Sequence, residues 1–208
     1  TAKIWNLSGN EIATLEHEQK VNKASFSPNS EYVVTASVDG TAKIWDLYGY
    51  EIASLQHDKD YNVSRAIFSP DSQRIITLSY KGEYNDKATY KITFWNSQNY
   101  EKISSISSLE FQQNKDRKFK VIDAVFTPNG RLVIVTTSEK GIVQLLDEQG
   151  KLIQELIGHD KGVINIAFSP DGQLIATASI DNTIRLWKWN PNQKLQDNLI
   201  LVLKGHTG

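Results

Sequence analysis

Residues 1–17 read TAKIWNLSGNEIATLEH, and residues 41–57 read TAKIWDLYGYEIASLQH. Twelve of the seventeen positions are identical at an offset of forty residues, which is far more than chance produces. A period of roughly 20–50 residues is typical of arrays in which each repeat forms one supersecondary unit. The repeat therefore decides the class of fold before any single element is assigned.

Three further markers recur along the chain. The first is FSP or FTP, which begins at Phe26, Phe68, Phe126 and Phe168. The second is a tryptophan that closes an alternating run, at Trp5, Trp45, Trp95 and Trp187, with Leu146 in the equivalent place. The third is a histidine ahead of each run, at His17, His57, His159 and His206. Their regular order indicates one repeated unit rather than unrelated motifs.

Each unit contains four short runs rich in Val, Ile, Leu and Thr, separated by Gly, Pro, Asn and Asp. In the last unit the runs are 163–168, 174–179, 183–187 and 199–203. This composition is typical of strands joined by tight turns. No amphipathic helical stretch competes, so the sequence predicts an all-β chain of antiparallel meanders.

These residues resemble the WD-repeat family, and the resemblance covers essentially the whole chain. The motifs that carry it are Gly158-His159, FSPDG at 168–172, Asp181-Asn182-Thr183, Trp187 and the pair Trp45-Asp46. The resemblance implies a β-propeller of four-stranded antiparallel blades around a channel. The regular phrasing is similar to bacterial WD-repeat arrays.

The strand count predicts about four and a half blades, an open arc of a larger ring. We expect a half blade at 1–17, blades at 18–57, 58–110 and 159–208, and a degenerate blade at 111–158. An insertion at 80–91 separates the second and third strands of the unit at 58–110, and another lies within 104–120. The missing blades of the same polypeptide are then the first expected partner, because open sheet edges invite pairing.

The resemblance also implies a structural tetrad of His, Ser or Thr, Asp and Trp in each regular blade. One set is His17, Thr35 or Ser37, Asp39 and Trp45, and the other is His159, Thr177 or Ser179, Asp181 and Trp187. The unit at 58–110 has His57 and Trp95, with Asp86 as a possible acid. The unit at 111–158 is expected to lack the tetrad, because Glu139 or Lys140 replaces the acid and Leu146 replaces the tryptophan.

Several classes of active site find no support in the sequence. The chain has no cysteine, so disulfides, zinc–thiolate sites and thiol catalysis are excluded. The histidines lie in separate repeats, which argues against a metal site, and no motif indicates a cofactor. A His-Ser-Asp set also matches a hydrolase, but this set recurs in each repeat whereas a nucleophilic site occurs once.

Two groups of residues are candidate protein-binding sites. The insertions offer Tyr80, Lys81, Tyr84, Tyr90, Arg117 and Lys118. The first strands carry a polar residue that varies among the units, at Lys23, Arg65, Asp123 and Asn165, which predicts the rim of the channel. The alternatives are a tolerated insertion and a hydrated channel mouth without a partner.

The leading hypothesis is a non-enzymatic scaffold or sensor that binds a protein or peptide through loops at one end of its blades. A propeller hydrolase and a purely structural part of a larger multidomain signalling protein remain alternatives. A net charge of −1 gives no basic field, so nucleic acid is disfavoured as a partner. With no membrane-spanning run or export signal, we expect no membrane partner and a cytoplasmic location.

Overall fold

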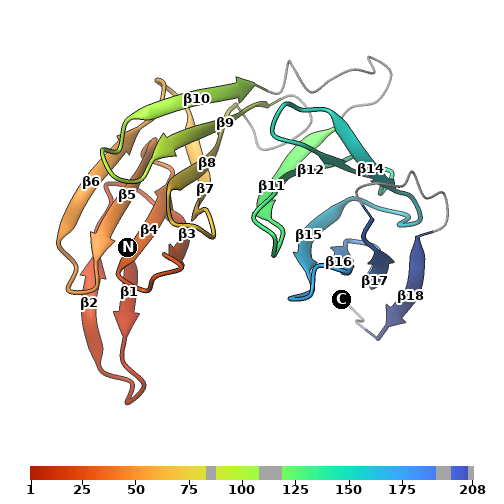
Figure 1. Ribbon diagram of the computed structural model, residues 1–208, viewed down its shortest axis with the longest axis horizontal. Coiled ribbons are helices and arrows are strands. Elements are labelled where there is room, and N and C mark those ends of the chain that lie inside the picture. The colour runs from red at the N-terminus through yellow and green to blue at the C-terminus, as the bar shows by residue number, and fades with distance from the viewer. Residues whose placement is uncertain (83–87, 108–118, 191–197, 206–208) are drawn as a thin grey trace. The chain divides into compact units, whose positions relative to one another are not determined.

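The computed structural model describes residues 1–82, 88–107, 119–190 and 198–205. All regular structure in this part of the chain is β-strand, arranged as four four-stranded antiparallel sheets and one two-stranded sheet (Figure 1). The predicted all-β fold class with four-stranded antiparallel blades is confirmed. Contacts divide the chain into two compact units, Thr1–Ser107 and Ser108–Gly208, which we describe separately.

The first unit contains one hairpin and two four-stranded sheets. The hairpin is formed by β1 (Ala2–Trp5) and β2 (Glu11–Leu15). The first sheet contains β3 (Val21–Phe26), β4 (Tyr32–Ser37), β5 (Thr41–Asp46) and β6 (Glu51–Gln56). The second contains β7 (Asn62–Phe68), β8 (Arg74–Lys81), β9 (Thr89–Asn96) and β10 (Lys102–Ser107).

The second unit contains two further four-stranded sheets. One contains β11 (Lys120–Phe126), β12 (Leu132–Thr137), β13 (Val143–Leu146) and β14 (Leu152–Leu156). The other contains β15 (Val163–Phe168), β16 (Leu174–Ser179), β17 (Thr183–Lys188) and β18 (Leu199–Lys204). The four strands predicted for this last sheet are confirmed, and β17 and β18 each extend one residue further.

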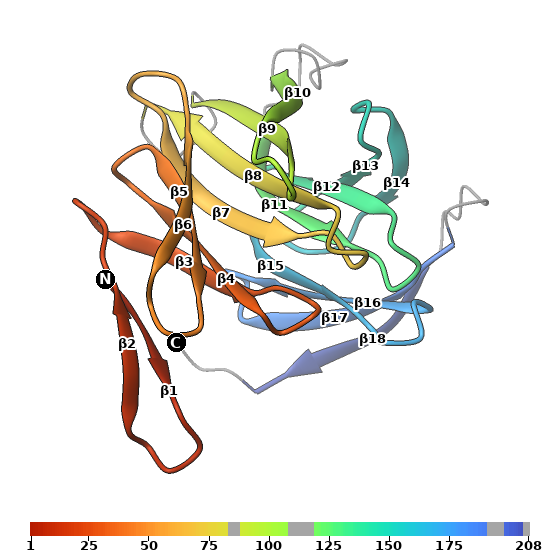
Figure 2. The ribbon, with the colours of Figure 1, turned by 60° about the vertical axis from the view of Figure 1, so that its left-hand side comes forward.

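Strands follow one another in chain order within every sheet, and Figure 2 shows this order for β7–β10. Each four-stranded sheet therefore has two distinct ends. The histidine end holds the segment before the first strand and the connection between the second and third strands. The proline end holds the turns between the first and second strands and between the third and fourth, including the FSP or FTP turn.

Apolar side chains from neighbouring sheets form the core of the first unit. Strand β7 contacts β3, β4 and β5, and the buried cluster there includes Val34, Ile44, Val63 and Ile75. A second cluster packs Ile4 and Leu15 of the hairpin against Val33 and Trp45. Burying these apolar faces between sheets stabilises a repeat that cannot form a core alone.

The second unit has a core of the same kind. Its buried cluster joins Val133 and Leu145 of the sheet β11–β14 to Ile166, Ile175 and Trp187 of the sheet β15–β18. In the part of the chain that the structure describes, no helix is long and apolar enough to cross a membrane.

The insertion predicted at 80–91 is shorter than the sequence indicated. Strands β8 and β9 continue into it, with Tyr80 opposite Tyr90 and Lys81 opposite Thr89. Tyrosine and threonine have a high β-propensity, so Tyr80, Thr89 and Tyr90 favour strand pairing, and the pairing extends the sheet. Most of the second insertion lies outside the described residues, and its first residues belong to β10.

Candidate functional site

A relay of hydrogen bonds links four side chains at the histidine end of the sheet β3–β6. The Trp45 indole Nε1 donates to Thr35 Oγ1 at 2.7 Å. His17 Nε2 lies 2.7 Å from Thr35 Oγ1, and its Nδ1 lies 2.8 Å from Asp39 Oδ2. Since Trp45 can only donate and Asp39 can only accept, the relay requires the His17 tautomer with its proton on Nδ1.

The sheet β15–β18 repeats this arrangement. Trp187 Nε1 donates to Thr177 Oγ1 at 2.8 Å, and His159 connects Thr177 to Asp181 over 2.8 Å and 2.7 Å. The structure therefore brings together the residues of both expected tetrads. In each case the threonine, not the serine two residues later, is the central hydroxyl.

Ser37 and Ser179 have a different role. The Ser37 hydroxyl donates to the Lys20 carbonyl at 3.1 Å and accepts from the Asp39 N–H at 3.2 Å. Ser179 donates to the Lys161 carbonyl at 2.8 Å and accepts from the Asp181 N–H. Both serines fix the backbone of the turn that presents the acid, so they support the tetrad from outside.

Burial and hydrogen bonding set the protonation states of this network. Burial lowers the pKa of His17, although its bond to Asp39 opposes the shift. Burial disfavours ionisation of Asp39, but bonds from Thr41 and His17 outweigh that effect and lower the Asp39 pKa to about 2. The pKa of Asp181 is likewise well below its usual range. Each relay thus ends on an ionised carboxylate that accepts from a neutral imidazole.

The sheet β7–β10 keeps the relay, but no carboxylate of the described residues bonds to its histidine. Trp95 Nε1 donates to Thr77 Oγ1 at 2.9 Å, and His57 Nε2 lies 2.7 Å from the same oxygen. His57 Nδ1 lies 3.2 Å from the Leu55 carbonyl, which takes the place of a carboxylate. Burial lowers the pKa of His57 to about 4. Asp86, the possible acid of this unit, lies outside the described residues.

The sheet β11–β14 retains only the central threonine. Thr136 precedes Leu146 by ten residues, just as Thr35 precedes Trp45, and it is 3% exposed. Its Oγ1 has no hydrogen-bond partner in the described part of the chain. Glu139 and Lys140, considered from the sequence as replacements for the acid, are exposed to solvent.

The tetrads are built for stability rather than for chemistry. The His17 side chain has no exposed surface, and its neighbour Thr35 already accepts from Trp45, so no substrate can approach this hydroxyl. The described residues also contain no group of three or more His, Cys, Asp or Glu side chains that could hold a metal ion.

A β-bulge precedes the variable polar residue in the first strand of every four-stranded sheet. The register shifts immediately before Lys23, Arg65, Asp123 and Asn165. A bulge re-aims the side chains beside it and often borders a binding site. Lys23 and Asn165 are exposed and Arg65 is half-buried.

Asp123 differs from the other three rim candidates. It is 2% exposed, and its Oδ1 accepts from the Ala124 N–H at 2.7 Å. The expectation that Asp123 faces a partner is therefore wrong for this structure. Of the four polar positions, Asp123 thus stabilises the backbone of its own strand.

The insertion candidates are also divided by burial. Tyr90 is 1% exposed, because β9 extends into the insertion and packs it, with its ring 6.3 Å from that of Tyr80. The prediction that Tyr90 contacts a partner is thus wrong. Tyr80 is half-buried, and the exposed Lys81 forms an ion pair with Asp60 at 3.1 Å. Tyr84, Arg117 and Lys118 lie outside the described residues.

Sequence reasoning missed two kinds of participant. Thr77 follows Phe68 by nine residues, as Thr35 follows Phe26, so counting from the FSP motif identifies it. Thr41 Oγ1 donates to Asp39 Oδ1 at 2.6 Å and lies 3.1 Å from His17 Nδ1, and Thr183 repeats these contacts. Their signal was the threonine two residues after each tetrad acid.

Family comparison agrees with this geometry. The sequence profile of WD40, described as WD domain, G-beta repeat, matches residues 9–46 and 150–188. Both segments include the turn and tryptophan of a complete tetrad. The chain therefore contains WD40 repeats at these two segments. WD40 propeller domains generally bind other proteins.

Similar proteins share these repeats at low identity. This WD-repeat chain is 28% identical over 199 residues to apoptotic protease-activating factor 1 of Danio rerio, covering 89% of this chain and 14% of that protein. It is 29% identical over 222 residues to serine-threonine kinase receptor-associated protein of Dictyostelium discoideum, covering 90% of this chain and 73% of that protein. It spans well under two thirds of several relatives, including the first of these.

A solved structure shows the same fold. The β-propeller domain of Cps50 (Swd1) from Myceliophteria thermophila matches with a TM-score of 0.74 and 15% sequence identity. The match covers 98% of this chain and 64% of that chain. At this identity the likeness concerns the fold alone.

Proposed function

We propose that this chain is a non-enzymatic scaffold that binds a protein or peptide through the residues after the first-strand bulges, which are Lys23 and Arg65 in the first unit and Asn165 in the second. The observation that carries the proposal is the β-bulge directly before each of these residues. The bulge recurs in the first strand of every four-stranded sheet, and a different side chain follows it each time. The backbone geometry is therefore repeated, whereas the side chain presented there varies.

The chemistry of the rim fits recognition of polar groups. Lys23 presents an ammonium and Asn165 an amide, both exposed, while Arg65 adds a half-buried guanidinium. These side chains donate hydrogen bonds, so each is suited to carbonyl or carboxylate groups of a peptide. Each unit contributes its own set, and the proposal applies to each separately.

The non-enzymatic part of the proposal rests on the tetrads. The hydroxyls and imidazoles that resemble hydrolase machinery are buried and bonded to one another, in two nearly identical copies. Some related proteins bear names that include receptor association, such as the Dictyostelium relative. A scaffold role agrees with such a relative, and the identity of this chain's partner is open to experiment.

Site-specific photo-cross-linking in cells tests the proposal. Benzoylphenylalanine is placed at Lys23 or Asn165 of the full-length protein, and a control carries it at Ser54, an exposed position on β6. We expect a discrete cross-linked protein from at least one rim position and none from Ser54.

The opposite outcome is equally clear. If Ser54 gives the same cross-linked protein, or if neither rim position gives any, binding does not occur at the rim. A Lys23→Glu variant sharpens the result, because reversing an exposed charge changes the association rate without affecting the buried core. An unchanged association rate with the captured partner would contradict the role of Lys23.

A further inference from the structure

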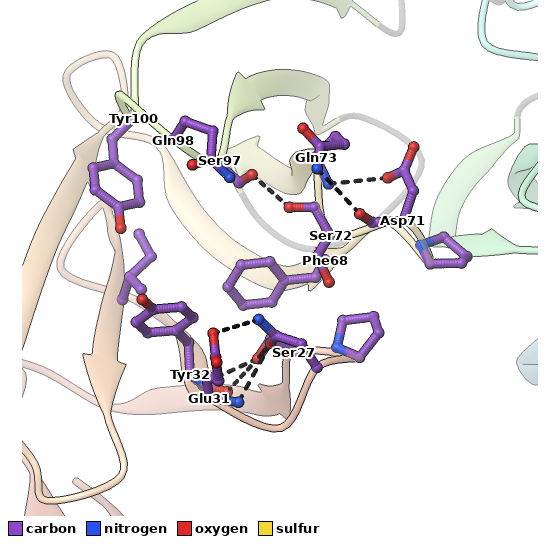
Figure 3. Close-up of a pocket in the computed structure, with 14 residues that line it drawn as sticks. Ser27, Glu31, Tyr32, Phe68, Asp71, Ser72, Gln73, Ser97, Gln98 and Tyr100 are labelled. Carbon is purple, nitrogen blue, oxygen red and sulfur yellow. Dashed lines mark hydrogen bonds between the residues drawn. The ribbon is translucent and has the colours of Figure 1, made fainter.

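The proline end of the first unit contains a cavity of about 550 Å³. Its walls are three turns: β3–β4 at 27–32, β7–β8 at 68–73, and β9–β10 at 97–100 (Figure 3). These turns lie up to about seventy residues apart in the sequence and meet only because β7 packs on β3 and β4. The volume is within the range of small-molecule and side-chain sites.

The turns that form the cavity are held in place by hydrogen bonds. Ser27 Oγ accepts from the Tyr32 N–H at 2.9 Å, and Ser69 Oγ accepts from the Arg74 N–H at 2.9 Å. Ser97 Oγ donates to the Ser72 carbonyl at 2.5 Å and ties the last turn to the second. The cavity is therefore preformed, which reduces the entropy lost when a ligand binds.

Aromatic rings line one side of this cavity. Figure 3 shows Tyr32, Phe68 and Tyr100 gathered there, with the two tyrosines coming from different sheets. Both tyrosines are half-buried, and neither hydroxyl has a hydrogen-bond partner among the described residues. Burial raises the pKa of Tyr100, and the neighbouring Tyr32 adds to the effect. Both phenol oxygens thus remain available as acceptors.

The backbone at Tyr100 adds a separate observation. Its φ of 60° is in the left-handed region, which is costly for a residue with a large side chain. Its N–H donates to the Asn96 carbonyl at 3.0 Å and holds this conformation. Strain of this kind is concentrated at binding sites, and here it accompanies a tyrosine that lines the cavity.

The charge of the lining is of one sign. Glu31 and Asp71 are exposed at its edge, and no Lys, Arg or His is among the described residues that line it. Bonds from the Ser69 hydroxyl and the Gln73 N–H lower the pKa of Asp71, so its carboxylate stays ionised. Aromatic faces and carboxylates together favour a cation over an anion.

We propose that this cavity binds an arginine side chain of a partner protein, with the guanidinium against Tyr32 and Tyr100 and near Glu31, while Asp71 adds negative charge from the other side of the cavity (Figure 3). Arginine fits better than lysine because its planar group stacks on aromatic rings and donates five hydrogen bonds. The remaining volume accommodates residues beside the arginine. The cavity lies at the end of β3, whereas the rim residue Lys23 follows the bulge at the start of β3, so this is a second, independent site.

A matched pair of small probes tests the assignment. The whole chain is titrated with N-acetyl-arginine amide and with the neutral isostere N-acetyl-citrulline amide, and backbone amide shifts are followed by NMR. We expect saturable shifts confined to residues 29–32, 71–73 and 97–101, with millimolar affinity for the arginine probe. The citrulline probe is expected to bind about fivefold more weakly, because it lacks the charge.

Variants separate the cavity from nonspecific attraction. Glu31→Gln with Asp71→Asn removes the charge, and Tyr32→Phe with Tyr100→Phe removes the acceptor oxygens while keeping the rings. Each pair is expected to weaken arginine binding by roughly two- to fivefold. Tyr48→Ala, at an exposed tyrosine outside the cavity, is the control and leaves binding unchanged.

Three results would overturn the proposal. They are equal affinity for the arginine and citrulline probes, shifts that do not map to the three turns, and affinities that neither variant pair reduces. The phenylalanine pair retains both aromatic rings, and its thermal unfolding, recorded beside the titration, separates lost folding from lost binding.

Discussion

The sheets β3–β6 and β11–β14 place a buried threonine at the same position, in opposite circumstances. Thr35 joins Trp45 to His17, and the relay ends on Asp39. Thr136 is also buried, but its hydroxyl has no partner in the described residues. The comparison shows that the threonine stabilises the blade only when its hydrogen-bond partners are present, because a buried hydroxyl without a hydrogen bond is destabilising.

The sheet β7–β10 lies between these two cases. It keeps the tryptophan, threonine and histidine, and it replaces the acid with a backbone carbonyl. Lys81 occupies the position equivalent to Asp39, four residues after the central threonine, and pairs with Asp60 at the surface. Among the described residues, a backbone carbonyl thus takes the place of the acid at the histidine, and the rest of the relay is kept.

The largest effect is expected from removing the central hydroxyl of a complete relay. Thr35→Val leaves the Trp45 N–H and the His17 Nε2 buried without partners, and it should lower the free energy of unfolding by about 4 kcal/mol. Urea-induced unfolding measures the change, and Thr14→Val, at a part-exposed site on β2, serves as the control. A loss below about 1 kcal/mol would contradict the structural role of the tetrad.

The second prediction concerns the pH dependence that His57 gives to the sheet β7–β10. The pKa of His57 is lowered from 6.5 to about 4, so the folded state favours the neutral imidazole. The neutral His57 contributes fully to the free energy of unfolding above pH 6.5. This contribution is lost as the pH falls from 6.5 toward about 4, which lowers the free energy of unfolding by about 3 kcal/mol for the whole shift. In contrast, the carboxylate of Asp39 loses its contribution only below its ordinary pKa of 3.8, as the pH approaches about 2.

Two measurements check this pH dependence. NMR titration of the imidazole protons should give His57 a pKa near 4. Unfolding at pH 7.5 and 4.5 should show that His57→Gln flattens the decline in stability. An ordinary pKa for His57, or the same decline in the variant, would show that burial does not control this histidine.

The third prediction compares the acid with its surface replacement. Asp39→Asn removes the charge that accepts from His17 and Thr41, and should reduce stability by about 2 kcal/mol. Lys81→Met breaks only the exposed pair with Asp60 and should cost less than about 0.5 kcal/mol. Thermal unfolding of both variants tests the difference, and equal losses would mean that the carboxylate adds nothing to the relay.

The smallest expected effect is a gain in stability rather than a loss. Thr136→Val replaces an unpartnered buried hydroxyl with a methyl group and should stabilise the protein by about 1 kcal/mol. The neighbouring Thr137 accepts from the Val163 N–H at 3.2 Å, so Thr137→Val should be destabilising. Urea-induced unfolding of this pair is the check, and destabilisation by Thr136→Val would reveal a partner for its hydroxyl.

The sequence by itself determined the repeat and the strand positions in the last sheet. These follow from local patterns, namely an offset of forty residues, alternating apolar runs and turn residues at fixed intervals. Its resemblance to the WD-repeat family implied the histidine, acid and tryptophan of both complete tetrads. It also indicated that the unit at 111–158 would lack the tetrad, since His and Trp are absent from its marker positions.

Tertiary structure alone decided which hydroxyl joins each relay. Thr35 and Ser37 are two residues apart on one strand and face the same side of the sheet, so alternation does not distinguish them. Strand register does, because it places Thr35 within reach of Trp45 and Ser37 beside the Lys20 carbonyl. Packing likewise buried Tyr90 and Asp123, and it joined distant turns into the cavity beside Tyr32 and Tyr100, since such contacts depend on neighbouring sheets rather than on residues nearby in the sequence.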